Sequence, residues 1–145
     1  MPRTMLAAVD FTPASARVCR AAAEYAALLG AEVVLVNVVH ELAALLGAYT
    51  HQSVRELQDA LERRGGEKLR ALAAEHFAGR GIAHRVVLAV GTPWAEILDC
   101  ALHEDACLLV IGTHGLRKPE HVFVGSTVQR VIEHARCRVL LVPPE

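Results

Sequence analysis

The sequence predicts one α/β domain built around a doubly wound, five-stranded parallel sheet. Short apolar runs alternate along the chain with longer segments of helical spacing, which is the pattern of repeated strand and helix units. The apolar runs are nearly continuous in Val, Leu and Ile, which is typical of strands covered on both faces. The length of 145 residues suits a single domain, so we expect residues 1–145 to fold as one unit.

Five strands are expected in this sheet. Right-handed crossovers favour a doubly wound arrangement, with the strand order 2-1-3-4-5 or 3-2-1-4-5. We predict 3-2-1-4-5, which places the carboxyl ends of the first and fourth strands side by side. Ligands of such sheets bind beyond the carboxyl ends, where the strand order reverses. The expected strands are 5–9, 32–39, 84–90, 107–112 and 138–142.

Two helices are expected to begin with a threonine followed by a proline. Thr12 and Thr92 are good N-caps, and Pro13 and Pro93 then occupy the first helical position, where a missing N–H costs nothing. Gly30 is expected to end the first of these helices in a left-handed conformation.

Residues 53–77 also show the apolar spacing of a helix. Gly65 and Gly66 interrupt this segment, so we expect a bend or a break at the pair. Residues 41–52 show no clear period and are expected to form a mobile loop. A last helix is expected to begin near Ser126.

The composition excludes several classes of protein. Apolar residues make up 53% of the chain and charged residues 21%, which is enough to bury a core and excludes a disordered tail. Lys and Arg number 15 against 16 Asp and Glu, and this net charge of -1 argues against a nucleic-acid partner. No apolar run approaches the ~18 residues of a membrane span, and the start lacks the pattern of a secretory signal. We therefore expect a cytoplasmic protein with no membrane partner.

The cysteines and histidines show no metal-binding spacing. No C-x-x-C pair is present, so buried, reduced thiols are expected. No H-E-x-x-H motif is present either, and we predict no metal site. Trp94, at the second position of a helix, is expected to pack rather than to stack on a base. The cysteines are Cys19, Cys100, Cys107 and Cys137.

A candidate anion site follows the fourth strand. Gly112 and Gly115 can let main-chain N–H groups approach an anion closely. Gly125, Ser126 and Thr127 begin the last helix, whose N-terminus offers unpaired donors and a partial positive charge. Together they predict a phosphate site in the crevice beyond the strands. Glycines between a strand and a helix are common in α/β domains, so taken alone they leave a purely structural role open.

Four motifs carry a resemblance to a known family, and they fall in the family's order along essentially the whole chain. They are Val9-Asp10-Phe11, Gly91-Thr92-Pro93, the pattern G-x2-G-x9-G-S at Gly112, Gly115, Gly125 and Ser126, and the ending from Cys137 to Pro143. On these motifs the sequence resembles the universal stress protein family in its ATP-binding form. The resemblance implies the adenine nucleotide alpha hydrolase-like fold with strand order 3-2-1-4-5, usually dimeric, with ATP held in the crevice.

The resemblance also implies roles for ten residues of this chain. Asp10 would accept hydrogen bonds from the ribose hydroxyls, which suits a carboxylate, although it can instead help to cap the following helix. The main chain of Val38 would contact adenine, and Ala8 would line the same pocket. The remaining residues would follow the ribose and phosphates or hold the β and γ phosphates: Ile111, Gly112, His114 and Gly115 in the first role, and Gly125, Ser126 and Thr127 in the second.

Three functions remain open, and we favour the first. It is an ATP-binding regulatory protein of the stress-response class, holding ATP with or without Mg²⁺, with no evident catalytic residue. A slow ATPase is disfavoured, because the chain has no G-x4-G-K-[ST] loop and no second carboxylate near Asp10 for a strong Mg²⁺ site. The third is a nucleotide-free interaction module. It rests on the apolar edge strand from Val139 to Val142, which is expected to pair with another copy in a homodimer.

Overall fold

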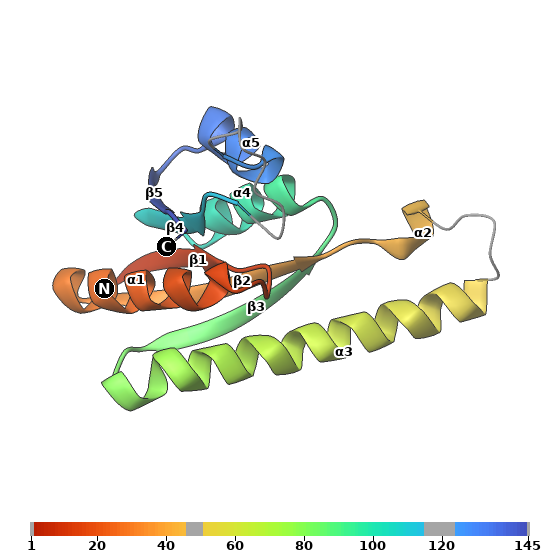
Figure 1. Cartoon of the computed structure of the whole chain (residues 1–145), viewed down its shortest axis with the longest axis horizontal. Helices are drawn as coiled ribbons and strands as arrows, with labels where there is room; N and C mark the ends of the chain where they lie inside the picture. The colour runs from red at the N-terminus through yellow and green to blue at the C-terminus, as the bar shows by residue number, and fades with distance from the viewer. Residues whose placement is uncertain (1, 46–50, 115–123, 145) are drawn as a thin grey trace.

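The computed structural model describes residues 2–45, 51–114 and 124–144. Its centre is a five-stranded, all-parallel sheet in the order β3-β2-β1-β4-β5, which confirms the predicted fold class and strand order (Figure 1). The strands are β1 (Arg3–Ala8), β2 (Ala31–Val39), β3 (His84–Val90), β4 (Leu108–Gly112) and β5 (Arg138–Val142). The carboxyl ends of β1 and β4 therefore lie side by side.

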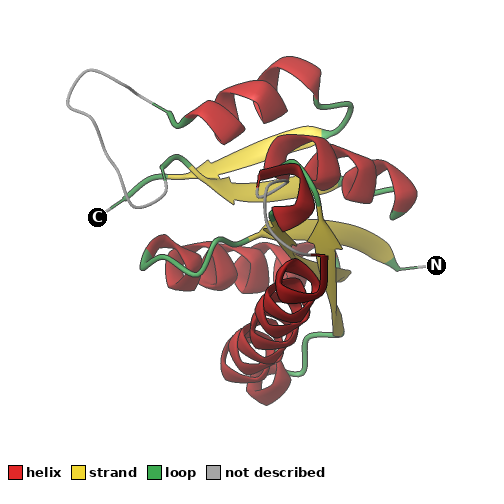
Figure 2. Ribbon diagram, turned by 90° about the vertical axis from the view of Figure 1, so that its right-hand side faces the viewer, coloured by secondary structure: helices red, strands yellow, loops and turns green. Residues whose placement is uncertain are grey.

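Helices cover both faces of the sheet, as strands of continuous apolar character require. They are α1 (Ala14–Leu29), α2 (Leu42–Leu45), α3 (His51–His76), the 3-10 turn η1 (Ala78–Arg80), α4 (Pro93–His103) and α5 (Ser126–His134). α1 and α3 pack on one face, and α4 and α5 on the other (Figure 2). Within the described ranges, no helix is both long enough and apolar enough to cross a bilayer.

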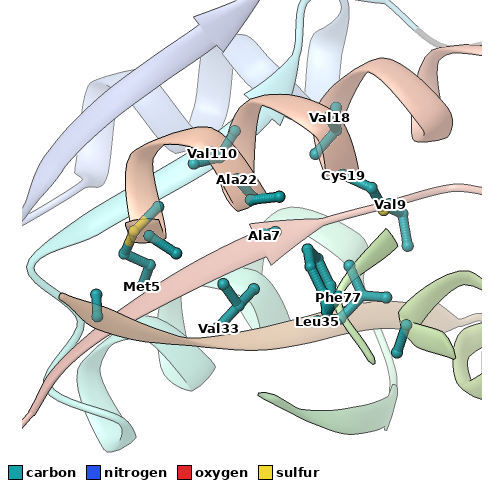
Figure 3. Close-up of a cluster of buried hydrophobic side chains, with 14 of the residues drawn as sticks. Met5, Ala7, Val9, Val18, Cys19, Ala22, Val33, Leu35, Phe77 and Val110 are labelled. Carbon is teal, nitrogen blue, oxygen red and sulfur yellow. The ribbon is translucent and has the colours of Figure 1, made fainter. Parts of the chain in front are cut away.

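The alternation of side chains along the central strands divides the core between the two faces. In β1, Met5 and Ala7 face α1 and α3, whereas Leu6 and Ala8 face α4 and α5. Small side chains on α1, such as Ala22, are fully buried against the sheet (Figure 3). They let α1 lie close to β1, β2 and β4, and this packing fixes where its N-terminus meets the carboxyl ends of the strands.

The two threonine–proline pairs behave differently. At α4, Thr92 is the extended N-cap and Pro93 is the first helical residue, as predicted. At α1 the prediction of Thr12 as N-cap is wrong, because Pro13 already has helical angles and occupies the cap position. The hydroxyl of Thr12 instead donates to the Oδ1 atom of Asp10 over 2.6 Å, a charged acceptor that makes a stronger hydrogen bond. Gly30 ends α1 with a φ of 61°, as expected.

α3 is unbroken from His51 to His76, so the expected bend or break at Gly65 and Gly66 is wrong (Figure 1). Gly65 is buried against the sheet, and a Cβ atom there would lie 3.0 Å from the Cδ1 atom of Leu88 in β3. The glycine thus permits close approach of helix and strand. This packing offsets the intrinsic cost of glycine in a helix, about 1 kcal/mol per residue.

Residues 41–52 do not form a loop throughout, which corrects the expectation. α2 occupies 42–45, α3 already includes 51 and 52, and residues 46–50 lie outside the described part of the chain. The N–H of Leu42 donates to the Oε1 atom of Gln58 in α3 over 2.8 Å. This partner for the first turn of α2 comes from sixteen residues along the chain, so no local pattern marks it.

The side chains expected to serve only in packing do so to different degrees. Cys19 is fully buried, and burial raises the pKa of its thiol to about 12. Cys100, Cys107 and Cys137 are only half-buried, because they lie near helix and strand ends rather than under a helix, and all four thiols are unpaired. Trp94 packs as expected, with its ring stacked on His134 at a centroid distance of 5.6 Å.

Candidate functional site

A cleft of about 590 Å³ opens beyond the carboxyl ends of β1, β2 and β4, where the strand order reverses. Its volume lies in the range of small-molecule sites. Nine of the ten predicted residues line it: Ala8, Asp10, Val38, Ile111, Gly112, His114, Gly125, Ser126 and Thr127. The tenth, Gly115, lies outside the described residues. The fold therefore gathers into one cleft residues that are scattered along the chain.

The turn after β4 is joined to the N-terminus of α5. The N–H of Gly125 donates to the carbonyl oxygen of Thr113 over 2.7 Å, so this N–H is already used within the protein. The next three N–H groups, of Ser126, Thr127 and Val128, belong to the first turn of the helix and have no intrahelical acceptor. All three residues line the cleft. They are the main-chain donors that α5 can offer to a ligand.

Glycine at positions 112 and 125 is not required by the packing of the protein itself. A Cβ atom at Gly112 would lie 3.7 Å from the side chains of Ala14 and Val18, which is an ordinary contact. A Cβ atom at Gly125 would lie 3.6 Å from the carbonyl oxygen of Thr113, which is also ordinary. Neither glycine has a left-handed φ. Close approach of a ligand to the main chain is a physical reason for glycine at both positions.

Asp10 directs its carboxylate onto the start of α1. Its Oδ1 atom accepts hydrogen bonds from the N–H of Thr12 at 3.0 Å, the hydroxyl of Thr12 at 2.6 Å and the hydroxyl of Ser15 at 3.3 Å. Asp10 therefore fixes the turn that leads into α1, but it does not cap the helix, because its side chain accepts from no main-chain N–H of α1. Within the described residues these bonds all use Oδ1, and the exposed side chain also lines the cleft. Its Oδ2 atom can accept from a ligand at the same time.

Phe11 turns the chain sharply after Asp10. Its φ of 62° lies in the left-handed region, which a bulky side chain rarely adopts. The ring packs against the core under α1 and α3, and the Nζ atom of Lys68 lies 5.3 Å from its centroid. These contacts offset the strain of the main chain. The turn sets the direction in which the chain runs from Asp10 to the start of α1.

The sequence interpretation missed two polar residues at the end of β2. Asn37 is 8% exposed, and its Nδ2 atom donates to the carbonyl oxygen of Val9 over 2.8 Å. It is the one polar side chain in the run from 33 to 39, and a lone amide in a buried strand is a signal that marks it. His40 is exposed directly after β2. The other lining residues not predicted are Val9, Ala14, Ser15, Val18, Val36, Pro93, Ile97 and Val128.

The described lining of the cleft carries little formal charge. Asp10 is its one carboxylate, and no Lys or Arg is part of it. His40 and His114 also line the cleft, and the Nδ1 atom of His114 lies 3.0 Å from the hydroxyl oxygen of Thr113. Within the described ranges, the cleft included, no three His, Cys, Asp or Glu side chains gather as metal ligands. The N-terminus of α5 is therefore the main source of attraction for an anion in this lining.

The polar groups of the cleft are ordered across the sheet. Main-chain donors lie at the junction of β4 and α5, a carboxylate oxygen at the end of β1, and polar groups of β2 on the far side. Val38, Ile97 and Ile111 add apolar wall. This arrangement suits an elongated ligand with an anionic end, hydroxyl groups in the middle and a flat, mostly apolar part.

Residues 1–143 match the model of the universal stress protein family. The universal stress protein in QAH/OAS sulfhydrylase 3'region of Thermus aquaticus is 33% identical over 143 residues, which cover 98% of this chain and 99% of that protein. The protein MJ0577 shares the fold with a TM-score of 0.86 at 23% identity, over 100% of this chain and 98% of that one. The universal stress protein from Archaeoglobus fulgidus, solved in complex with dAMP, has a TM-score of 0.59 and 25% identity over 97% of both chains. The chain therefore belongs to the universal stress protein family.

Proposed function

We propose that this chain binds ATP in the cleft and acts in the cytoplasm as a regulatory protein whose partners respond to its nucleotide occupancy. One observation carries the proposal: the 2.7 Å bond between Gly125 and Thr113 holds the N-terminus of α5 at the end of β4. Ser126, Thr127 and Val128, whose N–H groups have no intrahelical acceptor, then line the same cleft as Asp10. A helix terminus of this kind favours phosphate groups.

The strand order supports one orientation of the nucleotide. Neighbouring strands lie about 4.8 Å apart, so the ends of β4 and β2 are separated by about 10 Å, with β1 between them. The phosphates would lie beside α5, the ribose beside Asp10 and the base beside Val38. The Oδ2 atom of Asp10 would accept from a ribose hydroxyl, and the main chain of Val38 would contact the base.

A relative supports the nucleotide class of the ligand. The Archaeoglobus fulgidus protein that was solved with dAMP is similar to this chain along nearly its whole length. dAMP contains the base, the sugar and the first phosphate of a nucleotide. That the ligand also carries the β and γ phosphates of ATP is our own proposal, and the main-chain donors at the N-terminus of α5 support it.

We assign no catalytic residue. Asp10 is the one carboxylate in the described lining, and its Oδ1 atom is occupied by Thr12 and Ser15. Mg²⁺ is commonly held by one or two carboxylates together with substrate phosphates, so here it would enter mainly on the phosphates of ATP. Slow hydrolysis is the alternative. Equal rates of phosphate release by the wild type and by Ser126→Ala would reject it.

Isothermal titration calorimetry with ATP, ADP, AMP and adenosine tests the proposal. Gly112→Ala adds a Cβ atom that the protein accommodates at 3.7 Å, so we expect native stability and at least tenfold weaker binding of ATP. Gly79→Ala is the matched control, because Gly79 has open space around it and lies outside the cleft. Failure of the wild type to bind ATP below millimolar concentration would contradict the proposal. Unchanged binding by Gly112→Ala would contradict the location of the site.

We also propose a homodimer formed through β5. This strand is an edge of the sheet, and its apolar residues from Val139 to Val142 are incompletely buried within one chain. An apolar edge with unpaired main-chain groups readily pairs with another strand. The same dimer without nucleotide would be the alternative function, an interaction module.

Light scattering tests the dimer and should give twice the mass of the chain. The carbonyl of Val142 accepts from the N–H of Thr113, so Val142 faces β4, and by alternation the main chain of Val139 faces outward. Val139→Pro removes an outward N–H without removing a bond to β4, and is expected to give a folded monomer. A wild type that is already monomeric would exclude this dimer.

A further inference from the structure

The main chain of Val38 points to the side of β2 where β1 has ended. In a parallel ladder, the N–H and C=O of one residue point to the same side, and alternate residues share that side. Val36 accepts from the N–H of Val9 over 3.0 Å and so faces β1, whereas Val39 accepts from the N–H of Gly91 over 2.9 Å and so faces away from β1. Val38, two residues after Val36, therefore faces the β1 side.

The next rung of this ladder would join the N–H of Val38 to the carbonyl oxygen of Val9. That bond is not made within the described residues, because the pairing of β1 with β2 ends at Ala8 and Val36. The oxygen of Val9 accepts instead from the Nδ2 atom of Asn37 over 2.8 Å. A side-chain amide has thus taken the place of a main-chain donor at the point where the cleft opens.

We propose that Asn37 is a positioning residue of the nucleotide site: by satisfying the carbonyl of Val9, it keeps the N–H of Val38 unpaired and open to the base. The identity of the ligand rests on the proposed function above. A buried carbonyl needs a partner. Without the amide of Asn37, the N–H of Val38 is the donor in register. The two strands would then pair for one more rung and close the base end of the cleft.

The surroundings of Asn37 favour a functional reason for the amide. By alternation its side chain lies on the same face of β2 as Val33 and Leu35, which belong to the apolar core under α1 and α3. An apolar side chain of similar size would gain from burial there, whereas an amide is tolerated only when it is hydrogen-bonded. Folding alone would therefore favour leucine at this position.

Hydrogen exchange of the Val38 amide, measured by NMR in the absence of nucleotide, tests the inference. In the wild type this amide should exchange at least tenfold faster than that of Val36, which lies in the β1–β2 ladder. Asn37→Leu should keep or raise the stability, slow the exchange of Val38 at least tenfold and weaken ATP binding roughly five- to tenfold. Asn37→His should keep both wild-type properties, because a ring N–H can lie where Nδ2 lies now.

The outcomes separate this inference from the proposed function. Suppose that the wild type binds ATP but its Val38 amide exchanges no faster than the same amide in Asn37→Leu. This result would overturn the role of Asn37 and leave the proposed function standing. Weaker ATP binding by Asn37→Leu without slower exchange of Val38 would overturn it too, because the loss would then have another origin. If the wild type binds no nucleotide, the proposed function is overturned. If the Val38 amide still exchanges more slowly in Asn37→Leu than in the wild type, the role of Asn37 in the ladder is supported.

Discussion

The N–H of Gly125 and the carbonyl oxygen of Thr113 lie 2.7 Å apart, and this bond ties the start of the last helix to the end of the fourth strand. Gly125 is extended, with φ of -73° and ψ of 167°, and α5 begins at the next residue. Because Gly125 uses its N–H in this way, the donors available to a ligand begin at Ser126. Gly125 shapes the turn, and the three residues after it offer the N–H groups.

Replacing Ser126 by proline removes one of these donors without breaking α5. Ser126 is the first helical residue, where proline is favoured, and the extended conformation of Gly125 is the one required before a proline. We expect Ser126→Pro to weaken ATP binding by about tenfold and to leave adenosine binding unchanged, since adenosine has no phosphate. Calorimetry with both ligands measures the difference. Ser126→Ala keeps the N–H and should lose less ATP affinity than Ser126→Pro. Equal losses of affinity would assign the contact to the hydroxyl.

Substitutions of Asp10 separate its role in the turn before α1 from its proposed contact with ribose. Asn retains an oxygen that can accept from Thr12 and Ser15, whereas Ala does not. Asp10→Ala should lower the free energy of unfolding by about 1 kcal/mol through loss of these hydrogen bonds, and Asp10→Asn by less. Both should bind ATP more weakly and distinguish it less from 2′,3′-dideoxy-ATP. Urea denaturation and calorimetry provide the two measurements; undiminished discrimination in both variants would remove Asp10 from the ribose contact.

The glycine pair in α3 should respond unequally to alanine. At Gly66 a Cβ atom would lie 3.2 Å from the end of the flexible Arg70 side chain, which can move into solvent. Gly66→Ala should therefore raise the free energy of unfolding by about 0.5–1 kcal/mol, the gain in helix propensity. At Gly65 the new methyl would lie 3.0 Å from Leu88, so the gain should be smaller or reversed. Thermal or urea unfolding of the two variants measures these changes in stability. Equal changes for Gly65→Ala and Gly66→Ala would mean that α3 can shift on β3 to make room for the methyl group.

Stability should depend on pH through an ion pair at the opposite end of the sheet from the cleft. Arg85 in β3 donates to Glu104 after α4 through two nitrogens, one of them at 3.0 Å, and also lies 3.5 Å from Glu32 in β2. The hydrogen bond from Arg85 is the main cause that lowers the pKa of the Glu104 carboxyl. A carboxyl whose pKa is lower in the folded state contributes stability above its unfolded pKa, about 4.3, and loses it as the pH falls through the folded value.

The test compares wild type with Glu104→Gln across this pH range. The wild type should be more stable at neutral pH, and the difference should shrink as the pH falls below about 4.3. The midpoints of urea denaturation at each pH measure this difference in stability. Glu133→Gln is the control, because Glu133 accepts from the neutral amide of Gln129 and, within the described residues, from no cation. A difference that does not change with pH would show that the ion pair adds no stability of its own.

Local signals in the sequence were enough for most of the elements. Pro93 at the first turn of α4 and Gly30 at the end of α1 act through the geometry of a few neighbouring residues, so they can be recognised without the fold. The same holds for the glycines and hydroxyls around β4 and α5. The strand order was one of two that the sequence allowed, and the observed pairing of β1 with β4 decided between them.

Partners that lie far away in the chain explain what the sequence did not predict. Gly65 is a helix breaker by propensity, but α3 continues through it because Leu88 and Val39 of the sheet pack against that position. Asn37 reads as a lone polar residue in a strand until the fold brings Val9 within 2.8 Å of its amide. Hydrogen bonds and packing across the sheet depend on which strands become neighbours. The sequence alone therefore determined most of the elements, the family resemblance and nine of the residues that line the cleft. The tertiary structure decided which other residues join them, which of their donors and acceptors are already used and which can still bind a ligand.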